Sequence, residues 1–426
     1  MMRIFVGLLA VTVVAAGGAA GAQELGGVTL HGFLSAGYVR TTENDLYFAR
    51  TTEGTFEFND AALSFSTEPI ARLRIGAQLY AQDLGSYGNH RVIIDWAVGD
   101  YRVRDWFGVR AGKLKFPLGL YGTMRDADIG RPEIFQPEAV YSDLLKDLVR
   151  SFDGAAVYGS VEAGGAGYLD YEAFGGAVDA DETAVAQRLA RNSLPTFTSA
   201  LTAAGLRQAR GSAEPVDATM KHMYGGALEY RPPVRGLRLR FSGWTHESRL
   251  DSRAAVTGFL GPLPATFVLD THTDITHDYW LFASAEYQRG GLRVSAEQAW
   301  QKLSTVSTVT GLPTGPMSPS VSVTHPSGWY VQVAQRLNDK VQLSAYYSRY
   351  FEDSDDGTDI VRGNAEAFDR WDKDLAFTAR LDLGGHFLLK AEFHAIDGTN
   401  RLSAVENPQG LVQDWNMFAL RGTFHF

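Results

Sequence analysis

The sequence predicts an all-β fold, a transmembrane antiparallel β-barrel of about sixteen strands with short periplasmic turns and long extracellular loops. Three observations support this fold. Segments of alternating apolar and polar residues recur from Val28 to Phe426. Their connections switch strictly between short and long, and Pro69–Ala71, Arg289–Gly291 and Gly384–His386 are among the short ones. No apolar run of about 18 residues follows the N-terminal segment, so a helical membrane protein is disfavoured.

Residues 1–22 have the features of a cleaved secretory signal. Arg3 precedes a short apolar stretch, residues 4–16, and residues 20–22 read Ala-Gly-Ala, an A-x-A cleavage site. An uncleaved helical anchor is the alternative, but the apolar stretch is too short for it. We therefore expect residues 23–426 to form a single barrel domain after cleavage.

The alternating segments locate the strands along the chain. We expect them at 28–40, 56–69, 72–84, 91–103, 107–117, 151–162, 167–177, 221–231, 237–249, 278–289, 292–303, 328–338, 341–352, 369–384, 387–397 and 412–426. The stretches around 178–220, 250–277 and 304–326 are expected to be long outer loops, the first of them with short helices. An even number of strands places both termini on the periplasmic side.

Each strand has two faces, because successive side chains point to opposite sides. In one segment Leu237, Leu239 and Phe241 share a face, and Arg238 and Arg240 share the other. We expect the apolar face to meet lipid and the charged face to line the lumen. A water-soluble barrel or sandwich shows the same alternation with the faces reversed. The assignment therefore depends on the signal, the connections and the end of the chain.

The last strand is rich in aromatic residues and ends the chain. Phe418, Leu420, Gly422, Phe424 and Phe426 share one face. Here the sequence resembles the outer-membrane porins of Gram-negative bacteria, whose last strand typically ends in a phenylalanine that the barrel-assembly machinery reads. The resemblance implies an outer-membrane location, a homotrimer, and contact with the lipid bilayer and lipopolysaccharide. It also implies that Phe424 and Phe426 form the C-terminal assembly signal.

The third long connection, residues 118–150, is the expected constriction. In porins of this size the resemblance implies that this loop folds into the lumen. The run Gly112–Gly119 before it is similar to the porin O/P-like superfamily, which includes phosphate- and pyrophosphate-selective channels. The 178–220 loop is the alternative constriction. The charged residues expected to face the pore from the 118–150 loop are Arg125, Asp126, Asp128, Arg131, Glu133 and Glu138.

Arginines dominate the basic residues expected on the lumen wall. They are Arg74, Arg110, Arg238, Arg240, Arg293, Arg380 and Arg421. Guanidinium groups attract and orient anions, which predicts an anion preference. Alternatively, these arginines pair with lumen carboxylates. Lysines are few at these positions, so we do not extend phosphate specificity to this chain. The lumen aromatics Tyr80, Trp244, Trp280 and Tyr346 stack on sugars, anchor the barrel at the interface or pack beneath the folded-in loop.

Composition and motifs exclude several classes of function. The chain has 39 Lys and Arg against 49 Asp and Glu, a net charge of −10, which argues against a nucleic-acid partner. Cysteine is absent, so no disulfide stabilises the fold. The sequence has no H-E-x-x-H and no G-x-S-x-G motif. We predict no catalytic residues, no metal site and no cofactor.

The predicted function is passive diffusion of small hydrophilic solutes, with a preference for anions, through a water-filled barrel. The protein is then not an enzyme. One alternative is an outer-membrane lipid hydrolase or acyltransferase, for which His31 or His394 are candidates. Another is a non-transporting barrel that serves as an adhesin or structural anchor. A soluble secreted β-protein is a further alternative.

Overall fold

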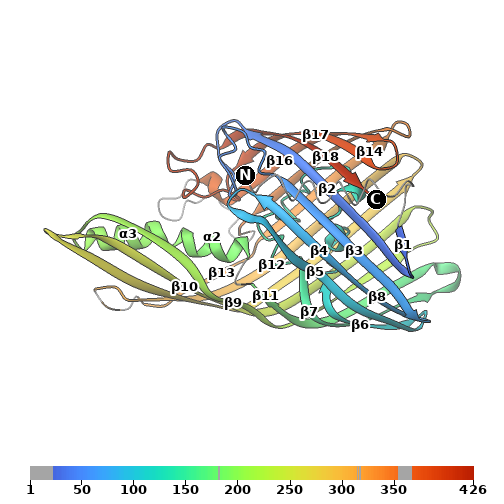
Figure 1. The fold of residues 1–426 in the computed structure, drawn as a ribbon, viewed down its shortest axis with the longest axis horizontal. Coiled ribbons are helices and arrows are strands. Elements are labelled where there is room, and N and C mark those ends of the chain that lie inside the picture. The colour runs from blue at the N-terminus through green and yellow to red at the C-terminus, as the bar shows by residue number, and fades with distance from the viewer. Residues whose placement is uncertain (1–22, 181–182, 314, 316–317, 354–366) are drawn as a thin grey trace.

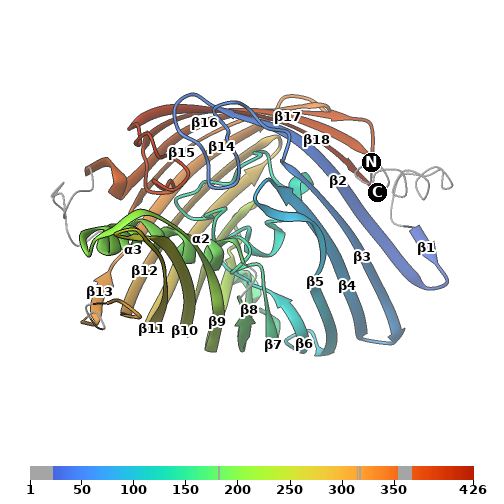
Figure 2. The ribbon, with the colours of Figure 1, turned by 60° about the vertical axis from the view of Figure 1, so that its left-hand side comes forward.

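The computed structural model describes residues 23–180, 183–313, 315, 318–353 and 367–426. Within them, sixteen antiparallel strands close into a barrel, because β18 pairs with β2 (Figures 1 and 2). The expected signal, residues 1–22, lies outside the described residues. The barrel strands are β2 (Val28–Thr41), β3 (Asn59–Ile70), β4 (Leu73–Leu84), β5 (Tyr87–Arg104), β6 (Phe107–Lys115), β7 (Ser151–Glu162), β8 (Tyr168–Asp179), β9 (Leu206–Arg231), β10 (Leu237–Leu260), β11 (Leu263–Arg289), β12 (Leu292–Thr310), β14 (Ser327–Arg336), β15 (Val341–Phe351), β16 (Trp371–Leu383), β17 (Phe387–Gly398) and β18 (Asp414–His425).

Two further strands pair at the margins of the barrel. The short β1 (Gln23–Leu25) pairs with the start of β2. β13 (Ser320–Thr324) pairs only with the outer part of β12, while β12 pairs directly with β14 around the barrel. All sixteen expected segments overlap a barrel strand, and the predicted fold class is confirmed. Within the described part of the chain no helix is both long and apolar enough to cross a membrane.

The strands β9 to β12 are much longer than expected. The prediction of a loop at 250–277 is wrong, because β10 and β11 remain paired as far as Leu260 and Leu263. A bulge between His246 and Ser248 shifts the register, and the ladder then continues outward. Polar side chains such as Arg253 and Asp270 interrupt the apolar face there. The sequence therefore lacks the regular alternation that predicts a strand and suggests a loop instead. We call this outward continuation of β9–β12 the extension.

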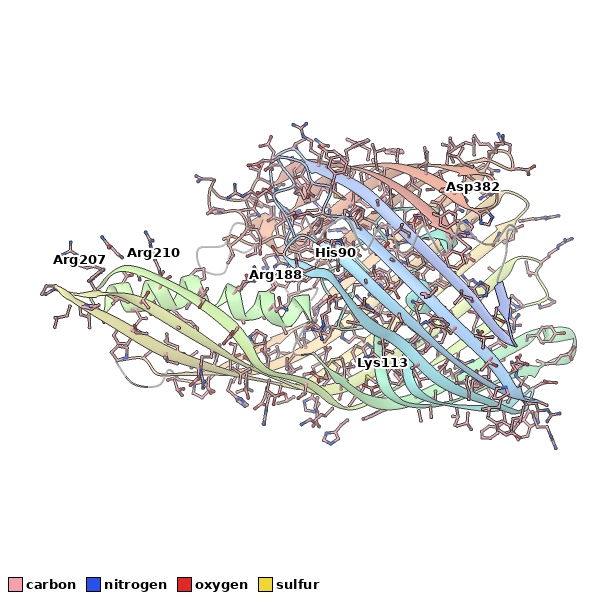
Figure 3. The ribbon with its side chains drawn as sticks, in the orientation of Figure 1. His90, Lys113, Arg188, Arg207, Arg210 and Asp382 are labelled. Atoms are coloured by element: carbon pink, nitrogen blue, oxygen red, sulfur yellow. The ribbon has the colours of Figure 1, made fainter. Side chains whose placement is uncertain are left out.

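Two helices pack along the extension and give it a small core of its own. They are α2 (Ala184–Asn192) and α3 (Leu194–Ala203), which Figure 1 shows beside β9 and β10. Phe197 and Leu201 of α3 pack with buried Val256 and Leu269 from the strands. The helices occupy part of the expected 178–220 loop, and its second half belongs to β9. In Figure 3, Arg207 and Arg210 mark the far tip of the extension.

The two faces of the barrel wall differ as lipid on one side and a polar lumen on the other require. On β10, Leu239 is 40% and Phe241 is 51% exposed, whereas Ser242 and Trp244 on the other face are 1% and 4% exposed. Charged side chains such as Glu297 and Lys390 are buried on the inside. A water-soluble barrel places its apolar residues inside, so the observed exposure is the reverse of that arrangement.

Candidate functional site

Residues 118–150, which we call the inner loop, lie inside the barrel rather than over its mouth (Figure 2). Two short 3₁₀ helices, η1 (Gly122–Met124) and η2 (Asp128–Gly130), shape its first half. Helical hydrogen bonds recur near its end, where Val149 N donates to Leu145 O at 3.0 Å. Most of its residues from 118 to 141 are buried. The loop is therefore held between walls of the barrel at several points.

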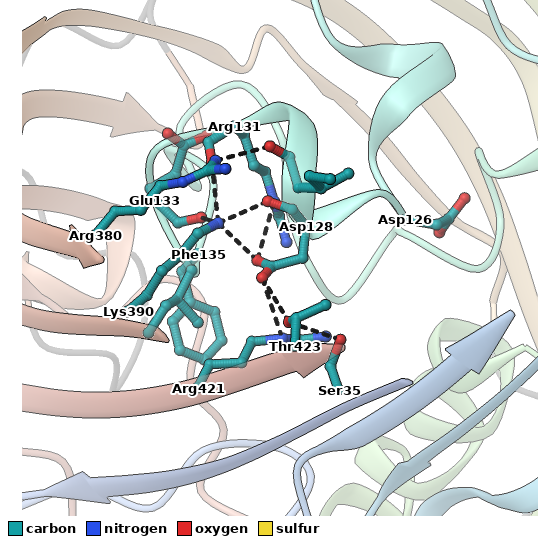
Figure 4. Close-up of polar contacts among 12 residues, drawn as sticks. Ser35, Asp126, Asp128, Arg131, Glu133, Phe135, Arg380, Lys390, Arg421 and Thr423 are labelled. Carbon is teal, nitrogen blue, oxygen red and sulfur yellow. Dashed lines mark hydrogen bonds and ion pairs between the residues drawn. The ribbon is translucent and has the colours of Figure 1, made fainter. Parts of the chain in front are cut away.

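The first anchor joins the inner loop to β17 and β18. Lys390 of β17 donates to the Asp128 carboxylate at 2.8 Å and to the carbonyl oxygens of Asp128, Arg131 and Glu133 at 2.7, 2.9 and 2.9 Å (Figure 4). Thr423 of β18 donates to the other carboxylate oxygen at 2.9 Å. A lysine ammonium has three donors, so the loop carbonyls and carboxylate satisfy it completely.

The same wall also holds the backbone that follows. The Glu392 carboxylate accepts from the backbone N–H groups of Ile134 and Phe135 at 2.7 and 2.9 Å. His394 lies between Glu392 and Asp374, at 2.9 and 2.8 Å from their oxygens, and is fully buried. His394 thus helps to position the Glu392 carboxylate, which binds the backbone of the inner loop. It faces the lumen, which removes it from any reaction at the lipid surface.

The second anchor lies farther around the wall, where β5 and β6 meet the inner loop. Lys115 forms ion pairs with Asp126 of the loop and, at 2.6 Å, with Asp95 of β5. Arg150 and Lys146 bring two more positive charges to within 4.0 and 3.8 Å of Asp126. Burial alone raises the pKa of Asp126, but the charges of Lys115, Lys146 and Arg150 outweigh it and hold the pKa well below its usual range.

The third anchor is a buried carboxylate on β12. Glu297 accepts from the backbone N–H of Leu120 at 2.8 Å and from the hydroxyls of Tyr141, Tyr330 and Ser284, each at 2.6 Å. Two of these donors belong to the inner loop and two to the wall. Four hydrogen bonds satisfy a carboxylate that has no ion pair among the described residues. With this contact the inner loop meets three separate parts of the wall.

The charged loop residues expected to face the pore are turned toward these anchors. Arg125, Asp126, Asp128, Arg131 and Glu133 are between 1% and 7% exposed, and Glu138 is half-buried. Glu133 accepts from Gln332 of β14 at 2.8 Å, and Arg125 donates to the carbonyl of Ser142 at 2.7 Å. Their charges therefore hold the loop to the wall more than they line an open passage.

The wall arginines also have partners, with one exception in the described part of the chain. Arg74 is exposed near the short-turn end and has no carboxylate within ion-pair distance there. The other six pair with carboxylates: Arg110 with Asp100 and Glu172, Arg238 with Glu229 and Glu286, Arg240 with Glu229, Arg293 with Glu286, Arg380 with Asp382, and Arg421 with Asp60 and Asp128. Pairing reduces the field that each of these arginines exerts on a passing ion.

The lumen aromatics pack beneath the inner loop. Tyr80, Trp244 and Tyr346 are at most 4% exposed. Phe116, just before the loop, meets Trp244 edge-on with ring centroids 4.9 Å apart. Packing beneath the inner loop is therefore the interpretation that describes the environment of these residues. Trp280 stacks on Phe282 in the same region.

An arginine-rich cavity opens at the short-turn end of the barrel. Its volume is about 1110 Å³, and it lies below the inner loop between the β9–β10 and β11–β12 turns. The arginines that line it are Arg231, Arg235, Arg238, Arg289 and Arg293, against one lining carboxylate, Glu286. We call this cavity the arginine vestibule. Sequence reasoning missed Arg231, Arg235 and Arg289 because they stand at strand ends and in a turn, where alternation assigns no face.

Comparison with solved structures gives the fold of the chain. No family model and no curated protein sequence matches the chain. OmpT of Vibrio cholerae, from its outer membrane, is a structural match with a TM-score of 0.52 at 10% identity, over 95% of this chain and 100% of that one. The outer membrane channel DcaP of Acinetobacter baumannii gives 0.51 at 12% identity, over 96% and 100%. Salmonella typhi OmpF, in complex with daunomycin, gives 0.52 at 10%, over 94% and 97%.

This chain has the barrel fold of outer-membrane proteins. Identities of 10 to 12% extend the likeness to the fold alone. The expected resemblance to outer-membrane porins is therefore supported at the level of architecture. The narrower similarity to phosphate-selective channels stays an expectation.

Proposed function

We propose that the protein is an outer-membrane porin of a Gram-negative cell that lets small hydrophilic solutes, preferably anions, diffuse passively through its barrel. The observation that carries this proposal is the inside-out wall: exposed apolar residues such as Phe241 on the outside and buried charges such as Lys390 and Glu297 inside. Sixteen strands enclose enough space for a water-filled channel.

The inner loop is the proposed constriction. It crosses the lumen and is fixed to β5–β6, β12 and β17–β18 by buried polar contacts. In contrast, α2 and α3 of the 178–220 region pack along the extension. A loop held at three places is a fixed barrier rather than a gate, which suits passive diffusion.

The anion preference has its support in the arginine vestibule. Arg235 and Arg289 are exposed, and no carboxylate lies within ion-pair distance of either in the described part of the chain. Unpaired guanidinium groups at a low-dielectric entrance raise the local concentration of anions. The paired arginines higher on the wall contribute less.

Further parts of the proposal come from the porin resemblance. They are a signal cleaved before Gln23, a homotrimer in contact with the lipid bilayer and lipopolysaccharide, and recognition of Phe424 and Phe426 by the barrel-assembly machinery. Phe424 packs on Phe387 with ring centroids 4.8 Å apart, on the outward face of the closing strands. This position leaves the C-terminal aromatics at the barrel surface, where an assembly factor has access.

A second candidate function is adhesion, and the extension favours it. Its strands and helices reach well beyond the barrel (Figure 1), and a passive channel has no need of such a projection. An outer-membrane hydrolase has less support, since His394 is buried in the lumen and His31 has no carboxylate partner among the described residues. Adhesion and conduction are compatible in one molecule.

Reversal potentials in a salt gradient test the anion preference. We expect the purified protein in a planar bilayer to favour anions, and Arg235→Gln with Arg289→Gln to move the reversal potential toward the cation side. Arg207→Gln with Arg210→Gln is the matched control, because these arginines lie at the tip of the extension, away from the lumen (Figure 3). Clear cation preference in the unmodified protein, or equal shifts in both double variants, would contradict the proposal.

A further inference from the structure

A second cavity lies between the inner loop and the β10–β11 wall. Its volume is about 210 Å³. Cavities of about 150 Å³ lined by apolar side chains accommodate benzene, so this volume is sufficient for one aromatic ring with a small substituent. The apolar side chains that line it are Phe116, Leu118, Val140, Leu144, Leu145, Val149 and Phe282.

Several hydrogen-bond donors at this cavity have no acceptor among the described residues. Trp244 and Trp280 line it, and neither indole N–H has a hydrogen-bond acceptor. The Nε–H of Arg125, which also lines the cavity, is likewise unpaired, although Arg125 is only 5% exposed. A buried donor without an acceptor is unfavourable, so a ligand with acceptor atoms gains from meeting these groups.

Two guanidinium groups lie at the cavity, and the nearby carboxyl groups differ in how far they neutralise them. Arg125 and Arg401 are its two cations. Asp372 is already paired with Arg401 at 3.0 Å. Burial, followed by the nearby Asp143 carboxylate, raises the pKa of Glu138 to about 8, so this carboxyl is mostly protonated at pH 7. Arg125 has no carboxylate within ion-pair distance among the described residues, although the more distant Asp143 and Asp126 carboxylates also act on its charge.

We propose that this cavity binds small aromatic carboxylates of one ring. The apolar lining and the tryptophan faces accept the ring, while the indole N–H groups and Arg125 receive the carboxylate. A neutral ring lacks the charge for Arg125, and an aliphatic carboxylate as small as acetate lacks the ring. The inference deepens the proposed function by naming a solute class, and it rests on that function. Binding is measured apart from conduction, so the two proposals fail separately.

Calorimetric titration of the folded protein in detergent tests this site. The probe is benzoate, with benzyl alcohol and acetate as controls for charge and ring. We expect benzoate to bind at least tenfold more tightly than either control. Absence of benzoate binding, or equal affinity for benzyl alcohol, overturns the inference even if the barrel conducts ions. Conduction without selectivity, on the other hand, leaves a positive titration standing.

Variants assign the binding to this cavity. Trp244→Phe with Trp280→Phe keeps an aromatic ring at each position but removes both N–H donors. We expect benzoate affinity to fall about tenfold in this double variant. Trp329→Phe is the matched control, since Trp329 packs on Tyr347 at 5.6 Å and does not line the cavity. Leu145→Trp fills the cavity and abolishes binding while leaving the polar anchors of the inner loop in place. Unchanged affinity in the double variant and in Leu145→Trp overturns the inference.

Discussion

The ammonium group of Lys390 lies 2.8 Å from the carboxylate of Asp128, and both side chains are fully buried. The two residues are 262 positions apart in the chain. This ion pair ties the inner loop to the wall on the side away from its own strands. Because a buried charge without its partner is very unfavourable, the pair fixes where the loop crosses the lumen.

Lys390→Met removes this tie. The substitution leaves the Asp128 carboxylate and three loop carbonyls without their donor, and we expect a loss of about 3–5 kcal/mol in unfolding free energy. Single-channel recordings should show larger and noisier conductance, because the inner loop is no longer held across the lumen. Thermal unfolding in detergent measures the loss of stability.

Lys373→Met is the matched control for Lys390→Met. Lys373 pairs with Asp397 at 2.7 Å, but the two side chains are 29% and 33% exposed. Exposed pairs contribute about 0–1 kcal/mol, so stability and conductance should stay close to those of the unmodified protein. Equal losses in the two variants would show that the Lys390 anchor has no special role.

Gly328→Ala should displace the inner loop by steric conflict. A Cβ at Gly328 would lie 1.9 Å from the carbonyl oxygen of Ala139, so the loop backbone packs directly on β14. We expect a destabilisation of about 1–3 kcal/mol and a changed conductance. Gly99→Ala is the control, since a Cβ there meets nothing within 4 Å. Wild-type conductance in Gly328→Ala would mean that this contact does not hold the loop.

Glu138 makes the stability of the fold depend on pH between about 4.5 and 8. Its pKa is raised from 4.5 to about 8, mainly by burial and then by Asp143, while Arg401 lowers it and Asp372 raises it further. The native state therefore holds a proton that the unfolded chain has lost, and stability falls as pH rises from about 4.5 to 8. Glu138→Gln has a neutral side chain at every pH. The melting temperature of this variant, relative to that of the unmodified protein, should therefore rise between pH 5 and pH 9. A constant difference across this range would contradict the assignment.

The paired arginines of the wall should affect ion selectivity mainly by neutralising their carboxylate partners. Replacing Arg110, Arg238 and Arg240 together by Gln leaves the carboxylates of Asp100 and Glu229 without their arginines and leaves Glu286 with Arg293 alone, and we expect reversal potentials to move toward cations. Removing a whole pair, as in Arg110→Gln with Asp100→Asn, should move them much less because the local charge is balanced. An unchanged reversal potential in the triple variant would show that ions do not pass this wall.

The strands within the membrane were predictable because one face must meet lipid. On β10, Leu239 and Phe241 alternate with Arg240 and Ser242, and the alternation assigns both faces. Beyond the bulge at His246 both faces of the strands meet water or a small local core, and the prediction of a loop at 250–277 was wrong. Alternation carries less information where no face meets lipid.

The anchors of the inner loop were not predictable from the sequence. Lys390, Glu392 and His394 stand out as charges on the inner face of one strand, and that signal indicates a lumen position. Their contacts with Asp128 and Ile134 depend on how far the loop reaches across the barrel, which no spacing in the chain reveals. The arginine vestibule was missed for the related reason that turns bring together arginines from separate hairpins.

Planar-bilayer recording of the purified, folded protein decides whether the barrel is an open, passive channel. We predict stepwise increases in current as single molecules insert, with a conductance that rises with salt concentration. Insertion confirmed by a heat-modifiable band on gels, without any ion-permeable steps, would contradict the account and favour the adhesin or structural alternative.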